Sequence, residues 1–161
     1  MAVRNGAAYL DRAIASIVTQ TMADLELVVV DDGSTDGTPA ILAAWTGRDT
    51  RIRAFRQEQR GIYTAANLGI SESRAQLIAR LDADDMAVPD RLEKQVAWFD
   101  ANPNVAVLGG WMISIDTDDR KLRLHTYLTD PPSVRQTLRR GPALAHPTVM
   151  MRKAVFLRLG G

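Results

Sequence analysis

The sequence predicts an α/β fold in which a doubly wound, mostly parallel sheet carries helices on both faces. Short apolar runs alternate with segments of helical periodicity through the first half of the chain, a pattern typical of right-handed βαβ units. The run from Leu25 to Val30 is nearly continuous and rich in valine, as in strands buried on both faces of a parallel sheet. Polar residues and glycines follow these runs, where such sheets bind their ligands.

The first half of the chain supplies four strands and three helices. Leu10, Ile14 and Ile17 recur at helical spacing, and the Ser, Thr, Asp and Gly residues after Val30 provide a turn and a helix cap. In order, we expect a short strand at 1–3, a helix from residue 7, a strand at 25–30, a helix at 39–45, a more exposed strand at 52–55, a helix at 63–73 and a strand at 77–81.

The second half of the chain is less regular. Leu92 and Phe99 share one apolar helix face, and Gly109-Gly110 permits a bend within a later strand. In order, we expect a helix at 89–100, a strand at 105–115, a strand at 122–128, a short basic helix at 133–140 and a helix at 153–159. All of these elements belong to one domain that covers residues 1–161.

Composition and charge limit the classes of function. The 161 residues are 46% hydrophobic and 24% charged, which is ordinary for a globular domain, and no cysteine is present to form disulfides or thiolate metal sites. The net charge of +1 gives no global attraction to nucleic acid or to an anionic membrane. No apolar run approaches the roughly 20 residues of a membrane span, and no signal peptide opens the chain. We expect a cytoplasmic location, with any membrane attachment residing on segments not present here.

Three carboxylates stand within four residues directly after the strand at 77–81: Asp82, Asp84 and Asp85. Like charges this close cost free energy unless a cation or hydrogen-bond donors lie among them. Mg²⁺ and Mn²⁺ prefer carboxylate oxygens and share their remaining positions with waters and substrate phosphates. The cluster therefore predicts either a site for a metal ion and a diphosphate or an acidic turn that caps the next helix.

Four residues are predicted to meet at one edge of the sheet. Asn5, Asp32, Gly61 and Asp84 each fall just after a strand, and the carboxyl ends of parallel strands share an edge. Neither a Gly-x-Gly-x-x-Gly nor a Gly-x-x-x-x-Gly-Lys-Ser/Thr motif occurs, which speaks against NAD-type and P-loop sites. A nucleotide at this edge would be held by carboxylates and a metal ion.

Several motifs together resemble the inverting family 2 glycosyltransferases of GT-A fold, which is Rossmann-like. They are Val-Arg-Asn-Gly-Ala-Ala-Tyr-Leu at 3–10, Glu-Leu-Val-Val-Val-Asp-Asp-Gly-Ser-Thr-Asp-Gly-Thr at 26–38, Asn-x-Gly at 67–69, Ala-Arg-Leu-Asp-Ala-Asp-Asp at 79–85, Pro-x-Arg-Leu at 89–92 and His-Pro-x-Val-Met-x-Arg at 146–152. The resemblance covers essentially the whole chain. It implies metal-assisted transfer of a sugar from a nucleotide-diphosphate sugar to a hydroxyl acceptor with inversion, using Mg²⁺ or Mn²⁺.

The resemblance implies a nucleotide site built from six positions, one of which, Asp82, belongs to the acidic cluster. Ala2 and Arg4 would lie against the base, and the Arg4 guanidinium could stack where many members have tyrosine. Asp32 would accept from a ring N–H of the base, with a helix cap as its alternative role. Gly61 would let the backbone approach the ligand, and Arg60 would either meet the diphosphate or be solvated.

The resemblance also assigns the acidic cluster. Asp82 would lie near the ribose, and Asp84 would ligate the metal ion that bridges the diphosphate. Asp85 would assist the metal or cap the next helix, and Asp31 would be structural. His146 would border the donor sugar or the acceptor, although a buried structural role is the more frequent one for such a histidine.

An inverting displacement needs a general base that deprotonates the acceptor hydroxyl. In the family this base is an aspartate downstream of the late His-Pro segment. No acidic residue follows Asp130, so no catalytic residue is identified, and the base is expected beyond Gly161. The first strand is also short for a central strand. We therefore expect a chain truncated at both ends or a clipped gene model, with a genuinely short protein as the alternative.

Two other classes of protein fit part of the pattern. A non-catalytic nucleotide- and metal-binding module without an acceptor half would account for the missing base. A phospho-receiver with a flavodoxin-like sheet also places acids at strand ends and needs a lysine after a late strand. Lys153 falls near a late apolar run, but the other motifs do not fit that class.

Overall fold

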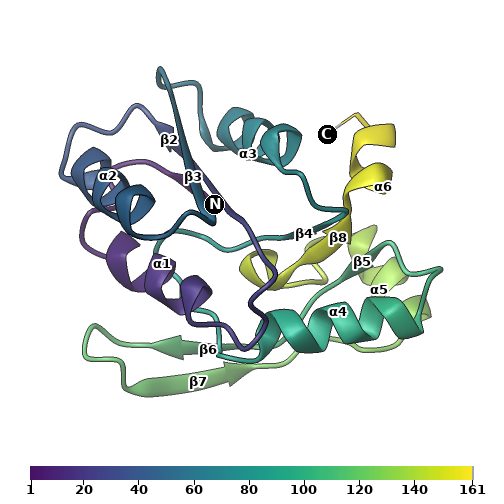
Figure 1. Cartoon of the computed structure of the whole chain (residues 1–161). Coiled ribbons are helices and arrows are strands. Elements are labelled where there is room, and N and C mark those ends of the chain that lie inside the picture. Colours follow the sequence, from purple (N-terminus) through teal and green to yellow (C-terminus); the bar gives the residue numbers. More distant parts are fainter. Residues whose placement is uncertain (161) are drawn as a thin grey trace.

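The computed structural model describes residues 1–160 and is shown in Figure 1. The strands are β1 (Ala2–Val3), β2 (Leu27–Asp32), β3 (Ile52–Gln57), β4 (Leu77–Ala79), β5 (Val107–Leu108), β6 (Met112–Ile115), β7 (Lys121–His125) and β8 (Met150–Arg152). The helices are α1 (Leu10–Val18), α2 (Thr38–Arg48), α3 (Ile62–Glu72), α4 (Arg91–Ala101), α5 (Pro131–Leu138), the 3₁₀-helix η1 (His146–Thr148) and α6 (Lys153–Arg158). Within this part of the chain, no helix is long and apolar enough to cross a membrane.

β2 is the middle strand of a parallel sheet with the order β1-β2-β3. Ala2 lies opposite Val30, and Leu27 lies opposite Ile52. Every residue of β2 is buried, as its continuous apolar run predicts. β3 buries only Ile52 fully, because it is the edge strand of this sheet, and its more exposed character is confirmed.

Helices cover both faces of the parallel sheet, as predicted. On one face, Leu27 and Val29 of β2 join a core with apolar side chains of α1 and α2. On the other face, Gly69 of α3 approaches Val30 so closely that an added Cβ would lie 3.4 Å from Val30 Cγ2. The side chains of β2 therefore alternate between two helical layers, and the predicted α/β class is confirmed.

β4 lies in a second sheet, which is antiparallel and has the order β4-β8-β5. Leu77 pairs with Arg152, and Ala79 pairs with Met150. This antiparallel pairing differs from the predicted arrangement, in which the first four strands would lie parallel in one sheet. β1 has only two residues, and among residues 1–160 no ladder joins it to β4. The pairing with β8 instead brings the late His-Pro segment to the strand that precedes the acidic cluster.

The strand predicted over residues 105–115 is broken into β5 and β6 at its two glycines. Gly109 lies against Leu144, where an added Cβ would be 2.9 Å from Leu144 Cδ2. Gly110 N donates to Thr148 Oγ1 at 2.9 Å. β6 then pairs with β7 in a separate antiparallel hairpin, which lies at the lower side of the molecule in Figure 1.

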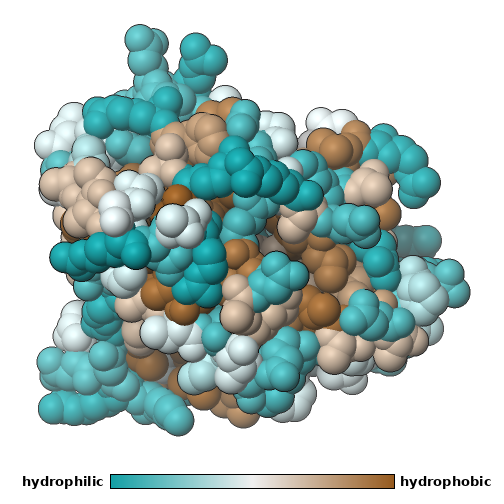
Figure 2. All heavy atoms as spheres, viewed as in Figure 1, coloured by the Kyte–Doolittle hydropathy of each residue, from teal (hydrophilic) through white to brown (hydrophobic). Residues whose placement is uncertain are grey.

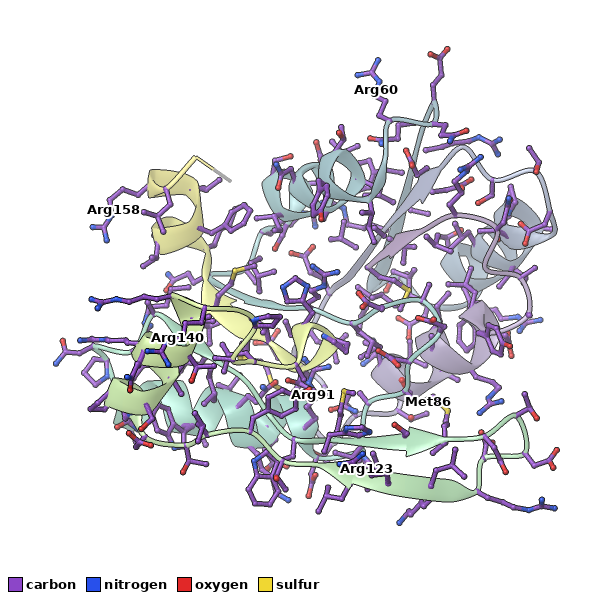
Figure 3. The ribbon with its side chains drawn as sticks, turned by 180° about the vertical axis from the view of Figure 1, so that it is seen from behind. Arg60, Met86, Arg91, Arg123, Arg140 and Arg158 are labelled. Carbon is purple, nitrogen blue, oxygen red and sulfur yellow. The ribbon has the colours of Figure 1, made fainter. Side chains whose placement is uncertain are left out.

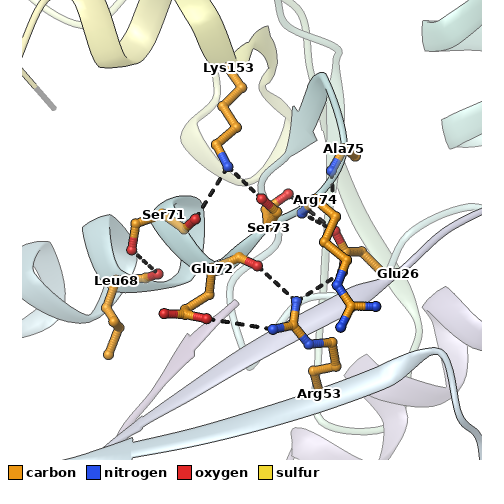
Figure 4. A network of polar contacts seen from close by, with 9 residues as sticks. All are labelled: Glu26, Arg53, Leu68, Ser71, Glu72, Ser73, Arg74, Ala75 and Lys153. Atoms are coloured by element: carbon orange, nitrogen blue, oxygen red, sulfur yellow. Dashed lines mark hydrogen bonds and ion pairs between the residues drawn. The ribbon is translucent and has the colours of Figure 1, made fainter.

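A polar network around Glu26 holds the amino end of β4 to the parallel sheet (Figure 4). Arg53 of β3 donates to Glu72 O at 2.7 Å and pairs with Glu26 Oε2 at 3.2 Å. Glu26 also accepts from the backbone N–H groups of Arg74 and Ala75. The single carboxylate of Glu26 therefore fixes the connection between α3 and β4.

Lys153 belongs to the same network. Its Nζ donates to the carbonyl oxygens of Ser71 and Ser73 at the C-terminal end of α3, where a cation is favourable. Its backbone N–H donates to Gln76 O at 2.8 Å, just before β4. Asp84 follows the opposite end of β4, so Lys153 does not supply the lysine that a phospho-receiver needs.

The pKa of Glu26 makes the stability of this network depend on pH. Burial raises that pKa, but the N–H of Arg74, the guanidinium of Arg53 and the N–H of Ala75 outweigh burial, and the net pKa is lowered. A carboxylate with a lowered pKa stabilises the folded state above its ordinary pKa of 4.5 and loses this contribution as pH falls through the folded value.

We expect Glu26→Gln to lower the free energy of unfolding by about 1–2 kcal/mol at neutral pH, because charge-assisted bonds are lost. The deficit should shrink as pH falls below 4.5, where wild-type Glu26 itself becomes protonated. Denaturant titrations at several pH values measure this loss of stability. Glu58→Gln, at an exposed site, is the control. A deficit that is the same at every pH would contradict this role of Glu26.

Candidate functional site

The turn after β1 is held to the loop after β2 by hydrogen bonds between main chain and side chains. Asn5 N donates to Ser34 Oγ at 2.9 Å, and Asn5 Oδ1 accepts from Thr35 N at 2.9 Å. Gly6 N donates to Thr38 Oγ1, also at 2.9 Å. Asn5 has a φ of 51°, a region that asparagine enters more readily than most residues. The polar loop after β2 thus fixes the shape of the first turn.

Asp31 has the structural role expected of it. Its buried carboxylate accepts from Ser34 N at 2.9 Å and lies 3.4 Å from Arg56 Nη1. Gly33 follows with a φ of 73°, and an added Cβ would lie 2.9 Å from Gln59 N. Only glycine fits this turn. The loops after β2 and β3 approach each other because of it.

Asp32 is 4% exposed and holds the loop after β3. Its Oδ1 accepts from Arg60 N at 2.8 Å and from Gln57 Nε2 at 2.6 Å, and its Oδ2 accepts from Gly61 N at 2.9 Å. The pKa of Asp32 is lowered by Arg60 N–H, then Gln57 and Gly61 N–H, with the charge of Arg4 adding to the effect. A carboxylate has about four acceptor positions, so Oδ2 retains one.

Arg60 and Gly61 form the turn from β3 into α3. Gly61 has a φ of 93°, which favours glycine. The Arg60 side chain extends away from the body of the molecule into solvent (Figure 3), and both of its predicted roles stay predictions. A hollow of about 460 Å³ lies beside this turn, lined by Gly33 and residues 56–59. Gln57 lines this hollow and also donates to Asp32, so the hollow adjoins Asp32.

The acidic cluster after β4 holds its three carboxylates in different environments. Asp82 Oδ1 accepts from Arg80 Nε at 3.1 Å, Asp84 is exposed and Asp85 is half-buried. Burial raises the pKa of Asp85, the charges of Asp84 and Asp82 raise it further, and Arg91 opposes the rise. Three or more metal-ligating side chains are not assembled into one group anywhere in residues 1–160. Any cation here would need further oxygen ligands from water or from a bound substrate.

Arg91 lies behind the acidic cluster, and sequence reasoning gave it no role. Its Nη2 donates to Arg80 O at 2.7 Å, and its Nε donates to Gln95 Oε1 at 3.1 Å. Gln95 Nε2 in turn donates to Thr148 O at 2.8 Å. Burial lowers the pKa of Arg91 to about 10, although Asp85 opposes this. The only sequence signal for this link is an arginine beside the apolar helix face, in Pro-x-Arg-Leu at 89–92.

His146 is exposed, so the buried structural role considered for it is wrong. Three residues later, Val149 O accepts from Arg80 N at 2.8 Å, which extends the pairing of β4 with β8 towards the acidic cluster. His146 is the first residue of η1, and its side chain is open to solvent.

The structure brings the segments after β1, β2, β3 and β4 together at one edge. A Cβ added at Gly6 would lie 3.8 Å from Ala83 Cβ, so the acidic cluster adjoins the turn after β1. Ala87 N donates to Ser16 Oγ at 3.0 Å and holds the chain beyond the cluster against α1. Ala2 lies opposite Val30, in the strand beside the one that ends at Asp32.

Comparison with protein families matches residues 1–160 to "Glycosyl transferase family 2". The chain belongs to this family. EpsE of Bacillus subtilis (strain 168), a putative glycosyltransferase, is 30% identical to it over 164 residues, which cover all of this chain and 58% of EpsE. The O-antigen biosynthesis glycosyltransferase WbnJ of Escherichia coli is 30% identical over 162 residues, covering all of this chain and 63% of WbnJ.

Two solved structures show the same fold. The mannosyltransferase PcManGT from Pyrobaculum calidifontis, in complex with GDP-Man and Mn²⁺, matches 99% of this chain with a TM-score of 0.73 and 23% identity. S. aureus TarS 1–349, in complex with UDP-GlcNAc, matches 98% with a TM-score of 0.73 and 19% identity. The GT-A fold is thereby confirmed. This family 2 member spans 45% of each of those chains, about half their length.

Proposed function

We propose that this family 2 glycosyltransferase binds a nucleotide-diphosphate sugar at the edge after β1 to β4 and that its sugar passes to a hydroxyl acceptor with inversion. The observation that carries the proposal is the meeting at this edge of a buried carboxylate with one free acceptor position, Asp32, and the acidic cluster at 82–85. A nucleotide diphosphate offers the matching parts, a base with ring N–H groups and a diphosphate that needs a cation. In support, PcManGT was solved with GDP-Man and Mn²⁺, and TarS with UDP-GlcNAc.

The base would lie between the end of β1 and the loop after β3. Asp32 Oδ2 would accept from a ring N–H, in the position that Gly61 N leaves free. Arg4 is exposed, and its charge acts on Asp32, so its planar guanidinium would cover the base together with the backbone at Ala2. Arg60 would need to turn from solvent to meet the diphosphate.

The acidic cluster fits a hard divalent cation, Mg²⁺ or Mn²⁺. Its carboxylates are close enough to raise the pKa of Asp85, and a cation would relieve this repulsion. Asp84, exposed and without an ion-pair partner among residues 1–160, would be the ligand, Asp85 would assist it, and Asp82, oriented by Arg80, would hold the ribose. When bound, the cation would stabilise the charge that develops on the departing diphosphate.

The remaining groups would position the donor for displacement at its anomeric carbon. The acceptor oxygen would attack opposite the diphosphate, so the configuration would invert. His146, which is exposed, would border the sugar or the acceptor. Removal of the acceptor proton is assigned to an aspartate beyond Gly161, and Gly161 itself lies outside the described residues. A non-catalytic module is not favoured, because the relatives that span the whole chain are glycosyltransferases by name.

Isothermal titration of UDP and of GDP tests the proposal. We expect one of them to bind at least about tenfold more tightly with Mn²⁺ than with EDTA, a difference of about 1.4 kcal/mol. Asp84→Asn should abolish this difference, because it removes the exposed carboxylate ligand. Asp24→Asn, an equal change of charge at an exposed residue of the loop before β2, is the matched control. Equal affinity in Mn²⁺ and EDTA would count against a metal role for Asp84.

A further inference from the structure

The carboxylate of Asp32 offers a ligand one hydrogen-bond acceptor position rather than two. Its Oδ1 already accepts from Arg60 N at 2.8 Å and from Gln57 Nε2 at 2.6 Å, which fills both acceptor positions of that oxygen. Its Oδ2 accepts only from Gly61 N, at 2.9 Å, so one position remains on it. A ligand that reaches Asp32 can therefore donate a single hydrogen bond to it.

The protonation state of Asp32 limits the ligand further. The N–H of Arg60 and then the amide of Gln57 lower the pKa of Asp32 below its ordinary value of 3.8, so the carboxyl group is ionised at neutral pH. An ionised carboxylate only accepts hydrogen bonds, and it repels a ring nitrogen that presents a lone pair. Asp32 therefore selects a base that carries a ring N–H on the edge facing it.

Donors and positive charge surround the remaining acceptor position. Figure 2 shows hydrophilic side chains gathered over the loop after β3, at the top of the view, where residues 56–60 read Arg-Gln-Glu-Gln-Arg. Arg4 and Arg60 are both exposed, and the charge of Arg4 acts on Asp32. The one acid of this loop, Glu58, is exposed. The site thus presents one acceptor with donors beside it, which suits a base edge with one donor between two acceptors.

The common bases differ on the edge that would meet Asp32, the edge by which bases outside a duplex are read. Uracil and thymine present one ring N–H, at N3, between two carbonyl oxygens. Guanine presents its ring N–H beside an amino group, so a carboxylate that reads guanine needs two acceptor positions side by side. Cytosine and adenine present a ring lone pair instead, which would face the charge of Asp32. Uracil and thymine therefore match the site.

We propose that the donor of this glycosyltransferase carries uracil or thymine, selected over guanine by the single remaining acceptor position of Asp32. This inference rests on the proposed function, in which Asp32 meets the base. The fold does not make this selection, because PcManGT was solved with GDP-Man and TarS with UDP-GlcNAc. A guanine held at Oδ2 would leave its second donor without a partner inside a buried site, and such a loss weakens binding.

Isothermal titration of UDP, dTDP, CDP and GDP in Mn²⁺ tests the selection. We expect UDP or dTDP to bind at least about tenfold more tightly than GDP and CDP, and the ratio of UDP to dTDP tells which of the two bases the donor carries. CDP is the matched probe, because it differs from UDP only at the N3 and C4 positions of the ring. If none of the four binds, the proposed function fails as well. If GDP or CDP binds as tightly as UDP and dTDP, this inference alone is overturned.

Gln57→Ala tests the number of acceptor positions as the cause of the selection. It removes one donor from Oδ1 and, because alanine leaves that space open, gives a ligand a second acceptor position beside Oδ2. The affinity for GDP should rise, so the preference for UDP over GDP should shrink about fivefold. Gln59→Ala, which removes the same amide from the same hollow, is the matched control and should keep the preference. Circular dichroism shows that both variants are folded. An unchanged preference in Gln57→Ala, or an equal change in Gln59→Ala, would overturn the proposal.

Discussion

Asp32→Asn is expected to lower both the free energy of unfolding and the affinity for a nucleoside diphosphate. An amide has one acceptor oxygen, so at least one of the donors at Gln57, Arg60 and Gly61 would lose its partner inside a buried site. Unsatisfied buried donors and lost charge-assisted bonds cost about 1–3 kcal/mol each, and we expect a loss of about 3 kcal/mol in total. The affinity should fall in EDTA as well as in Mn²⁺, because in the proposed site Asp32 would contact the base and not the metal ion.

The matched variant for Asp32→Asn is Gln57→Leu. It removes one donor to Asp32 but leaves the carboxylate and its two backbone donors in place. Denaturant titration should show a smaller loss of stability, of about 1 kcal/mol, and isothermal titration should show little change in nucleotide affinity. Unaltered affinity in folded Asp32→Asn would remove Asp32 from the proposed base site.

The parallel sheet and the edge that carries the candidate site were predictable because the signals for them are local. The continuous run in β2 is buried on both faces, and the aspartates and glycine that follow it form the tight turn that their sequence indicates. Asp32 and Asp84 could be placed at one edge from strand order alone. The roles assigned to them stay predictions, since they came from the family resemblance rather than from local pattern.

The remaining features depend on contacts between distant residues, which periodicity does not show. The pairing of β4 with β8 joins residues 77 and 152, and neither short strand carries a signal for its partner. Arg91 reads as an ordinary first-turn residue of α4 until its bond to Arg80 O is seen.

Arg91→Met is expected to disturb the acidic cluster without touching a ligand. The variant leaves Arg80 O and Gln95 Oε1 without their donor and Asp85 without its nearby cation, which should cost about 2–4 kcal/mol of stability. Arg91→Lys should recover only part of this stability, because one ammonium group cannot reproduce the forked guanidinium that donates to both Arg80 O and Gln95 Oε1. Lys94→Met, on the exposed side of the same helix, is the matched control and should cost little.

The affinity of Arg91→Met for a nucleoside diphosphate separates positioning from general destabilisation. Arg91 acts on the loop that holds Asp84, so the advantage of Mn²⁺ over EDTA should shrink while the affinity in EDTA is unchanged. Asp32→Asn has the opposite pattern, with a loss that is already present in EDTA. The two variants therefore divide the edge into a base side held by the loop after β3 and a metal side held by α4. If Arg91→Met lowered the affinity equally in Mn²⁺ and EDTA, the link from Arg91 to the acidic cluster would be structural only.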